Sequence, residues 1–336
     1  MERGGGMKKI KIGQIGIGHN HATAMMEAVR KFPQFFDVIG YAEENERWIA
    51  QRGGHPAYQG LPRRSVQEII DEADAVLVEC EVPYLTSIAK RCVDAGKHIH
   101  MDKPASGSLE EFTTLLQSAK EQGLVVQTGY MYRYNNGVKK CLELIREGAL
   151  GEIYSINAEM STYHTIEYKR WLTQFDGGIF YILGCHLVDL IVHILGEPKK
   201  ITKFFHQTGL DGVQFPDNNL VVMEYDKAIA RVFVSSVEVN GWGRRQFFVS
   251  GSKGSVNICP MENKIKVYYS DTQIADTPYA DRRVELDVQD VLPTCRYDEM
   301  AQEFYDLIVH QTCNPFGMEH EITLKKIMDE ICLTKA

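Results

Sequence analysis

Short apolar segments alternate with helical patterns through the first third of the chain, and this alternation limits the fold more than any other feature. Apolar segments predict five strands, at 9–17, 36–42, 75–81, 98–101 and 124–128. Helical patterns separate them, at 21–31, 65–72, 85–95 and 109–122. Strands and helices of this length favour a parallel sheet with right-handed crossovers. We predict a doubly wound α/β domain over residues 7–128.

The pattern changes after Gly129. Residues 138–147 and 178–195 have helical patterns, whereas strand patterns dominate from about 201 to 288, and helices at 297–311 and 321–333 close the chain. Strands separated by Gly, Asn and Asp turns are typical of antiparallel sheets. We therefore predict that 129–336 form an α+β domain with a large, mostly antiparallel open sheet.

One apolar stretch, residues 177–196, approaches the length of a membrane span. It contains His186, Asp189 and His193, however, and ionisable groups are costly in hydrocarbon. In a helix these three residues share one face. We predict a buried helix whose polar stripe faces a cleft, and we expect no membrane partner.

Charge and cysteine content exclude further classes of partner and indicate the cellular location. The chain has 37 Lys and Arg residues against 45 Asp and Glu residues, a net charge of −8, and no basic run. Nucleic acids and anionic membranes attract basic surfaces, so neither partner is expected. The eight cysteines form no CxxC element and no apolar signal segment begins the chain. A reducing, cytoplasmic location is the expectation.

Gly16 and Gly18 stand where the first predicted strand meets a helix. Glycines at this junction allow a tight turn and close approach of the backbone to a pyrophosphate at the helix N-terminus. The third glycine of the G-x-G-x-x-G fingerprint is replaced, so a simple tight turn is the alternative. The candidate dinucleotide-binding residues of this loop are Gly16, Gly18, His19, Asn20 and His21.

Glu43 ends the second predicted strand. A carboxylate at that position accepts hydrogen bonds from a ribose diol and repels a 2′-phosphate, so Glu43 favours NAD and makes NADP the weaker candidate. A solvated glutamate at a strand end is the alternative, and Arg47 nearby softens the preference.

Two H-x-H elements, His19 with His21 and His98 with His100, make a metal site conceivable. His19 and His21 already belong to the candidate phosphate loop, His98 and His100 lead into the next motif, and no carboxylate triad is evident. We expect no metal.

Lys103 follows a predicted strand in the segment AGKHIHMDKP, residues 95–104. Open α/β sheets bind ligands at the carboxyl ends of their strands. A lysine there can hold a substrate hydroxyl and, with its pKa lowered by burial, exchange the hydroxyl proton. A surface lysine is the alternative.

These motifs, taken in order, resemble the Gfo/Idh/MocA family (glucose–fructose oxidoreductase, inositol dehydrogenase and MocA). The similar segments are IGIG at 15–18, DAVLV at 74–78, AGKHIHMDKP at 95–104, GYMYRYN at 129–135, LGEI at 150–153 and GGIFYILGCHLVDLIVHILGEP at 177–198. The resemblance implies a Rossmann domain followed by a domain whose open sheet often mediates oligomerisation, here a homodimer or homotetramer. It also implies oxidation of a secondary hydroxyl of a sugar, glycoside or cyclitol by bound NAD(P), or the reverse reduction.

The resemblance assigns catalysis to Lys103, the lysine of the family's E-K-P motif, and to His186, the histidine of its D-x-G-x-H motif. They would bracket the reacting carbinol, and Lys103 would also contact the cofactor. The family's aspartate is Ile182 here, so the usual relay is incomplete. Glu81 lies in the segment replacing the family's T-P-N-x-x-H element and is a further cofactor candidate.

The resemblance also places substrate-binding residues near the second-domain motif: Arg133, Tyr163, His164, Trp171 and Asp189. An aromatic ring with hydrogen-bonding neighbours suits a carbohydrate, whereas packing of Tyr163 and Trp171 and an ion pair of Arg133 are the alternatives. An NAD-dependent sugar or cyclitol oxidoreductase is the leading prediction. The altered relay keeps open a redox-neutral glycosidase or epimerase with tightly bound NAD, and a non-catalytic dinucleotide sensor is the third alternative.

Overall fold

The structure, a computed structural model, describes residues 8–289 and 295–333. Within these residues the chain divides into two compact units, one of 8–131 with 295–322 and the other of 132–289 with 323–333. Met7, where the predicted first domain begins, lies outside the described residues. The first unit is therefore completed by a segment from near the end of the chain.

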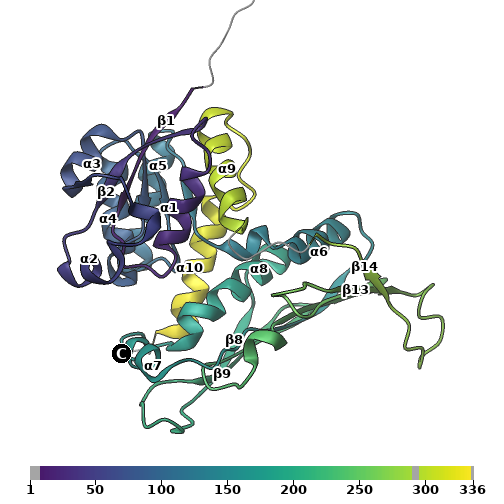
Figure 1. Cartoon of the computed structure of the whole chain (residues 1–336). Coiled ribbons are helices and arrows are strands. Elements are labelled where there is room, and N and C mark those ends of the chain that lie inside the picture. Colours follow the sequence, from purple (N-terminus) through teal and green to yellow (C-terminus); the bar gives the residue numbers. More distant parts are fainter. Residues whose placement is uncertain (1–7, 290–294, 334–336) are drawn as a thin grey trace, which may run out of the picture. The chain divides into compact units, whose positions relative to one another are not determined.

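The first unit contains a six-stranded parallel sheet in the order β3-β2-β1-β4-β5-β6 (Figure 1). Its strands are β1 (Ile10–Ile15), β2 (Phe36–Ala42), β3 (Arg63–Arg64), β4 (Ala75–Val78), β5 (His98–Met101) and β6 (Val126–Thr128). Its helices are α1 (Ala22–Arg30), α2 (Glu46–Arg52), α3 (Val66–Glu72), α4 (Leu85–Asp94), α5 (Leu109–Glu121) and α9 (Cys295–Val309). This topology confirms the predicted doubly wound α/β fold.

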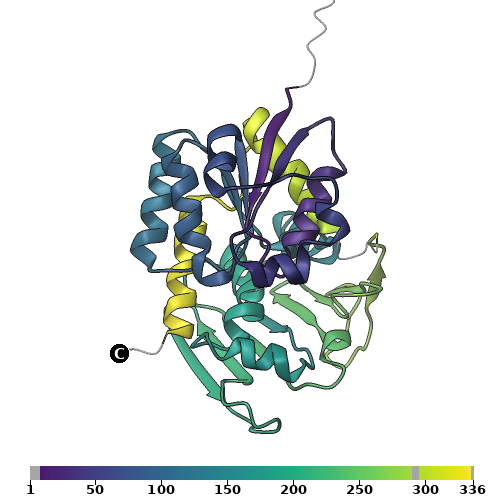
Figure 2. The ribbon, with the colours of Figure 1, turned by 60° about the vertical axis from the view of Figure 1, so that its left-hand side comes forward.

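Helices cover both faces of this sheet. The helices α1 and α9 pack together on one face, and α3, α4 and α5 lie on the other, with α4 and α5 side by side (Figures 1 and 2). Every residue of β4 is buried, as expected of a central strand covered on both sides. Capping boxes begin two of the helices, Ser65 with Glu68 at α3 and Ser108 with Glu111 at α5.

The second unit contains an eight-stranded sheet in the order β14-β13-β12-β11-β7-β10-β9-β8, in which only the β7–β10 pair is parallel. The strands are β7 (Ile153–Glu159), β8 (Lys200–His206), β9 (Asn218–Glu224), β10 (Ile229–Ser235), β11 (Gln246–Gly251), β12 (Gly254–Ile258), β13 (Val267–Asp271) and β14 (Val284–Leu286). The prediction of a large, mostly antiparallel sheet is confirmed.

Helices of the second unit include α6 (Asn136–Arg146), α7 (Ile166–Leu172) and α8 (Cys185–Leu195), and α10 (Met318–Cys332) begins in the first unit and ends in the second. Burial alternates along β9, so that Val221 and Met223 are buried while their neighbours are partly exposed. This period of two indicates a sheet with one face against the core. The helices α6 and α8 pack on that face.

The apolar stretch of 177–196 is not one regular helix. A π-helical turn, η4 (Phe180–Gly184), precedes α8, which ends at Gly196 with a φ of 74°. Such turns are frequent at functional sites. They rotate the residues before the turn around the helix axis relative to the residues after it. Among the described residues, no helix is long and apolar enough to cross a membrane.

Candidate cofactor and catalytic sites

The loop between β1 and α1 requires glycine at two positions. Gly16 has a φ of 86°, and a Cβ atom there would lie 2.3 Å from the Cys80 Cα atom. A Cβ atom on Gly18 would lie 2.8 Å from Glu81 Cγ and 2.9 Å from Trp48 Nε1. The loop therefore runs directly against the segment that follows β4, which a side chain at either glycine would prevent.

The N-terminus of α1 has neither a capping side chain nor an acidic residue of its own. His21 precedes the helix and its side chain makes no capping hydrogen bond, and the first turn of α1 contains no acidic residue. The amides of a first helical turn point outward and carry partial positive charge, which suits a phosphate group. The end of the loop thus fits the pyrophosphate of a dinucleotide.

Glu43 lies just past β2 and is tied to the same loop. Its Oε2 accepts a hydrogen bond from the Ile17 amide over 2.8 Å, and its Oε1 accepts one from the Asn45 amide over 2.9 Å. The Asn45 side-chain amide in turn lies 3.5 Å from Glu81 Oε2. Glu43 and Glu81 therefore lie at the edge of the glycine loop, and the carboxylate of Glu43 is held in place with acceptor capacity to spare.

Arg52, at the end of α2, is a residue of this loop that the sequence reasoning missed. Its Nη1 donates to the carbonyl oxygens of Ile17, at 2.9 Å, and His19, and its Nη2 donates to the Asn20 side chain at 3.0 Å. The guanidinium also lies 4.6 Å from the centroid of the Trp48 ring. It brings a positive charge to the candidate phosphate loop. No local motif marks such an arginine, because its partners lie 30 or more residues away in the chain.

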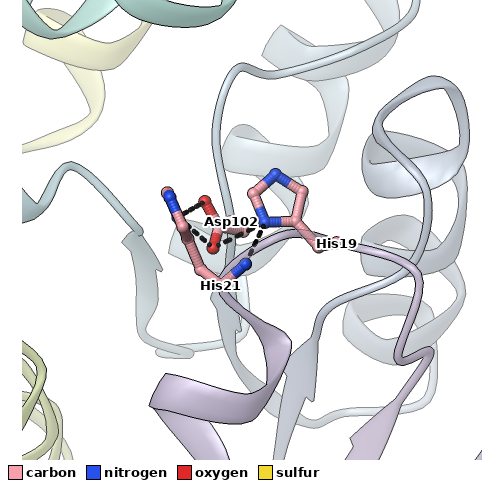
Figure 3. Close-up of side chains that lie close together, drawn as sticks. All are labelled: His19, His21 and Asp102. Carbon is pink, nitrogen blue, oxygen red and sulfur yellow. Dashed lines mark hydrogen bonds and ion pairs between the residues drawn. The ribbon is translucent and has the colours of Figure 1, made fainter. Parts of the chain in front are cut away.

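His19, His21 and Asp102 come together in a buried cluster (Figure 3). Asp102 Oδ2 lies 3.0 Å from Nδ1 of His19 and 3.0 Å from Nδ1 of His21. His19 Nε2 lies 3.1 Å from the carbonyl oxygen of Lys103. Asp102 is more than 80 residues from these two histidines in the chain and reaches them through the sheet order β1-β4-β5, which no local motif shows.

Glu79 adds a second carboxylate beside this cluster. It follows β4, is fully buried, and lies 3.8 Å from His19 Nδ1 through Oε2 and 3.6 Å from His100 Nε2 through Oε1. Burial, together with the adjacent Asp102 carboxylate, raises the pKa of Glu79 well above its usual range. Burial alone would also raise the pKa of Asp102, but His19 and His21 hold it well below its usual range.

Lys103 is buried, with 3% of its surface exposed. It directly follows β5 and the Asp102 carboxylate, whose Oδ1 accepts a hydrogen bond from the Lys103 amide over 2.6 Å. The alternative of a surface lysine is therefore wrong. The lysine belongs to the carboxyl-terminal edge of the parallel sheet, where ligands of such folds bind.

His186 lies in the first turn of α8 in the second unit and is also buried. Its ring packs edge-to-face against Tyr132, with 4.8 Å between ring centroids. Asp189, three residues later, does not turn toward solvent: Arg133 donates to it from Nη2 over 2.6 Å and from Nε over 3.0 Å. Ile182, at the family's aspartate position, is a buried residue of the π-helical turn.

Tyr132 joins a polar network that the sequence reasoning did not find. The Tyr132 hydroxyl donates to Glu262 in a short hydrogen bond and accepts one from Arg245 Nη1 over 2.7 Å. Arg245 Nη1 also lies 3.6 Å from Glu262. These three buried groups fix the ring that packs against His186. Arg245 and Glu262 stand more than 100 residues from Tyr132, which hides the network from local patterns.

The remaining predicted substrate residues gather around α7. His164 stacks on Tyr168, with ring centroids 4.2 Å apart, and Tyr168 lies 5.1 Å from Trp171. Tyr163 is 59% exposed. Burial, with the charges of Arg245 and Lys169, lowers the pKa of His164 to about 4. The group therefore offers exposed aromatic surface and a neutral imidazole at physiological pH.

The fold and the glycine loop are those of a dinucleotide-binding protein. A family model described as an oxidoreductase family with an NAD-binding Rossmann fold matches residues 10–130. A second, described as the GFO/IDH/MocA C-terminal domain, matches residues 138–257. The chain belongs to the Gfo/Idh/MocA family of oxidoreductases, as its motifs predicted.

Individual relatives are distant. A scyllo-inositol 2-dehydrogenase (NADP⁺) of Bacillus subtilis is 33% identical over 114 residues, which are 33% of this chain and 32% of that protein. A 2,7-anhydro-N-acetylneuraminate hydratase of Escherichia coli is 24% identical over 180 residues, 48% of this chain and 45% of that protein. The chain thus spans less than half the length of either relative.

Among solved structures, an Agrobacterium radiobacter oxidoreductase in complex with NAD⁺, L-tartaric acid and magnesium superposes with a TM-score of 0.82. It is 12% identical, and the match covers 96% of this chain and 95% of that one. At this identity the likeness concerns the fold.

Proposed function

We propose that this protein is an NAD-dependent oxidoreductase that transfers a hydride between a secondary hydroxyl of a sugar, glycoside or cyclitol and the nicotinamide. The observation that carries the proposal is the combination of a glycine loop held by Glu43 with a buried lysine at the end of β5. The cofactor, when bound, accepts or returns the hydride. The chain's own residues bind it and manage the hydroxyl proton.

Within the cofactor site, the first turn of α1 and Arg52 hold the pyrophosphate, and Glu43 accepts hydrogen bonds from the adenosine ribose. Both Glu43 oxygens already accept backbone hydrogen bonds, so the carboxylate cannot easily turn away from an added phosphate. Its charge favours NAD over NADP. The inositol dehydrogenase relative is named for NADP⁺, so this preference is a property of the present chain that needs its own measurement.

Lys103 and His186 are the proposed catalytic residues. Lys103 holds the reacting hydroxyl and exchanges its proton, because it is a buried cation at the carboxyl edge of the sheet. His186 is the second proton-exchanging group. Tyr132 is proposed as its positioning residue, since the ring of Tyr132 packs on it. The residues Tyr163, His164 and Trp171 supply stacking and hydrogen bonds for a carbohydrate ring.

The direct test is turnover by the purified full-length chain with NAD and a panel of hexoses, glycosides and inositols. We expect NADH to accumulate with at least one polyol, in proportion to the oxidised product. A chain that binds NAD tightly but oxidises no member of a broad panel would instead support the dinucleotide-sensor alternative.

A redox-neutral reaction is the second candidate, because Ile182 removes the family's aspartate and one relative is named a hydratase. In that case bound NAD would take a hydride and return it within each cycle. Product formation without net NADH would favour this candidate, whereas NADH formed in equal amount to product would exclude it.

We also propose that the protein is a homodimer or homotetramer that associates through its larger sheet. On the face away from α6 and α8, Phe204 pairs with Leu220 and Leu220 with Phe233 across neighbouring strands. Phe204 is 47% exposed and Ile229 58%. Exposed apolar side chains on a sheet face are typical of a self-association surface.

Light scattering on the eluting protein tests this proposal. We expect a dimer or tetramer for the wild-type chain and a smaller species for Leu220→Asp. Leu210→Asp is the control, because Leu210 lies in a loop and is 73% exposed. A monomeric wild-type chain would contradict the proposal.

A further inference from the structure

The proposed hydride transfer makes no use of the cluster of His19, His21 and Asp102. We propose that these three side chains bind one divalent transition-metal ion of the zinc class. The cluster lies wholly within the first unit, at the carboxyl ends of β1 and β5. The expectation of no metal rested on the lack of a carboxylate triad in the sequence, and the fold brings Asp102 to His19 and His21.

The hydrogen bonds around His19 determine which nitrogen carries its proton. A carbonyl oxygen can only accept a hydrogen bond, so Nε2, 3.1 Å from the Lys103 carbonyl, carries the hydrogen. Nδ1 accepts a long hydrogen bond, 3.3 Å, from the His21 amide and therefore has a lone pair. That lone pair lies 3.0 Å from Asp102 Oδ2. Two electron-rich atoms this close require a proton or a metal ion between them.

The ligand set suits a zinc-class ion. Two imidazole nitrogens and one carboxylate oxygen lie within 4.8 Å of one another and point toward a common centre (Figure 3). Nitrogen and oxygen donors from two histidines and one carboxylate are a known set for zinc and similar ions. The surrounding bonds are also those of a metal site: His19 donates its other N–H to a carbonyl, and Asp102 Oδ1 accepts the Lys103 amide.

Glu79 provides an independent indication. Its carboxylate is fully buried, and neither oxygen accepts a hydrogen bond from a donor among the described residues. Oε2 faces the same His19 nitrogen at 3.8 Å. A buried carboxyl group without a donor holds a proton or neighbours a cation, and an ion bound at the cluster would supply that cation. His21, with 21% of its side chain exposed, is the most accessible member of the cluster and borders the route by which an ion enters.

The proposal is tested by measuring the metal content of the protein, which does not depend on its enzyme activity. The untagged full-length protein is stripped with a chelator, equilibrated with Zn²⁺, dialysed, and analysed by elemental mass spectrometry. We expect one equivalent of Zn²⁺, and with Co²⁺ the intense visible absorption of a low-coordinate site. In His21→Ala and Asp102→Asn, we expect affinity to fall by at least about tenfold.

His310→Ala is the matched control. His310 and Asp306 form an exposed pair 3.8 Å apart, so its loss should leave the stoichiometry at one. Because Asp102→Asn removes a buried acceptor, folding of each variant is checked by circular dichroism. Zn²⁺ should raise the melting temperature of the wild type and of His310→Ala but not of the cluster variants. The proposal would be overturned if the folded wild-type chain bound no Zn²⁺ or Co²⁺, or if the cluster variants bound these ions as the wild type does. In that case a proton, and not a metal ion, lies between His19 and Asp102.

Discussion

The Arg133 guanidinium and the Asp189 carboxylate form a two-point ion pair in the interior of the second unit, with hydrogen bonds of 2.6 and 3.0 Å. Asp189 is fully buried and the Arg133 side chain is 4% exposed. Both residues were predicted to bind substrate. The ion pair that the sequence left as the alternative for Arg133 is present, next to His186, which lies one helical turn before Asp189. The Asp189 carboxylate is thus already paired with a guanidinium.

Breaking this pair should destabilise the protein strongly. Arg133→Met and Asp189→Asn each remove one charge of this buried pair, and we expect either to lower the free energy of unfolding by about 3–5 kcal/mol. Denaturant titration checks this. The double variant Arg133→Met/Asp189→Leu should be less affected than either single variant. Arg231→Met is the control, because it breaks a pair in which Arg231 is 44% exposed, and should cost less than about 1 kcal/mol. Equal, small losses of unfolding free energy at both pairs would show that the Arg133–Asp189 pair does not stabilise the fold.

Replacement of Lys103 should separate catalysis from cofactor binding. In Lys103→Met the buried stem is kept and the proton-exchanging ammonium is lost, so we expect kcat to fall by roughly 10²–10⁴-fold. The Kd for NAD, measured by calorimetry, should change far less. Lys97→Met is the control: Lys97 lies six residues earlier and donates to the Ala73 carbonyl oxygen. Full activity of Lys103→Met would show that Lys103 takes no part in catalysis.

Glu43→Gln should weaken the preference for NAD over NADP. The amide oxygen can still accept one of the two backbone hydrogen bonds, but the charge that repels a 2′-phosphate is gone. A hydrogen bond to a charged group contributes about 1.5–3 kcal/mol. The Kd for NADP divided by the Kd for NAD should therefore fall by roughly tenfold or more. Glu46→Gln is the control, since Glu46 is 78% exposed and pairs with Arg63. An unchanged ratio would mean that other residues select the cofactor.

Acid should destabilise the second unit partly through His164. The folded-state pKa of His164 is about 4, whereas its ordinary value is 6.5. Between these two values the unfolded chain binds the proton and the folded chain does not, so stability falls as pH is lowered from 6.5 to 4, by at most roughly 3 kcal/mol from this group.

The variant His164→Gln isolates that contribution. Other buried histidines whose pKa is lowered, including His100, act in the same direction, so only the difference between wild type and variant is informative. We expect unfolding free energies measured at several pH values to decline less steeply in His164→Gln. His310→Gln, at an exposed site, should follow the wild type. Parallel curves for all three proteins would refute the assignment.

Local sequence was enough to predict, in order, five of the six strands of the first unit and four of the helices between them, but not β3 or α2. Hydrophobic period and capping residues act within a few positions of one another, and Ser65 with Glu68 and Ser108 with Glu111 do begin helices as such patterns suggest. The π-helical turn before His186 was not predictable in this way. Its i→i+5 hydrogen bonds depend on packing around Gly184, where a Cβ atom would lie 2.8 Å from the Phe180 ring.

The sequence by itself determined the class of protein: a glycine loop after a first strand, an acidic residue after the second, and a lysine after another. These are features of a single segment, and each residue's neighbours in the chain are enough to identify it. Only the tertiary structure decided which of these residues meet. Strand order brings Glu79 and Asp102 to His19 and His21, because β1, β4 and β5 are adjacent and their carboxyl ends share one edge of the sheet. In the folded interior, a buried carboxylate needs a proton, a neighbouring cation or a hydrogen-bond donor. The sequence does not say which of these three it has.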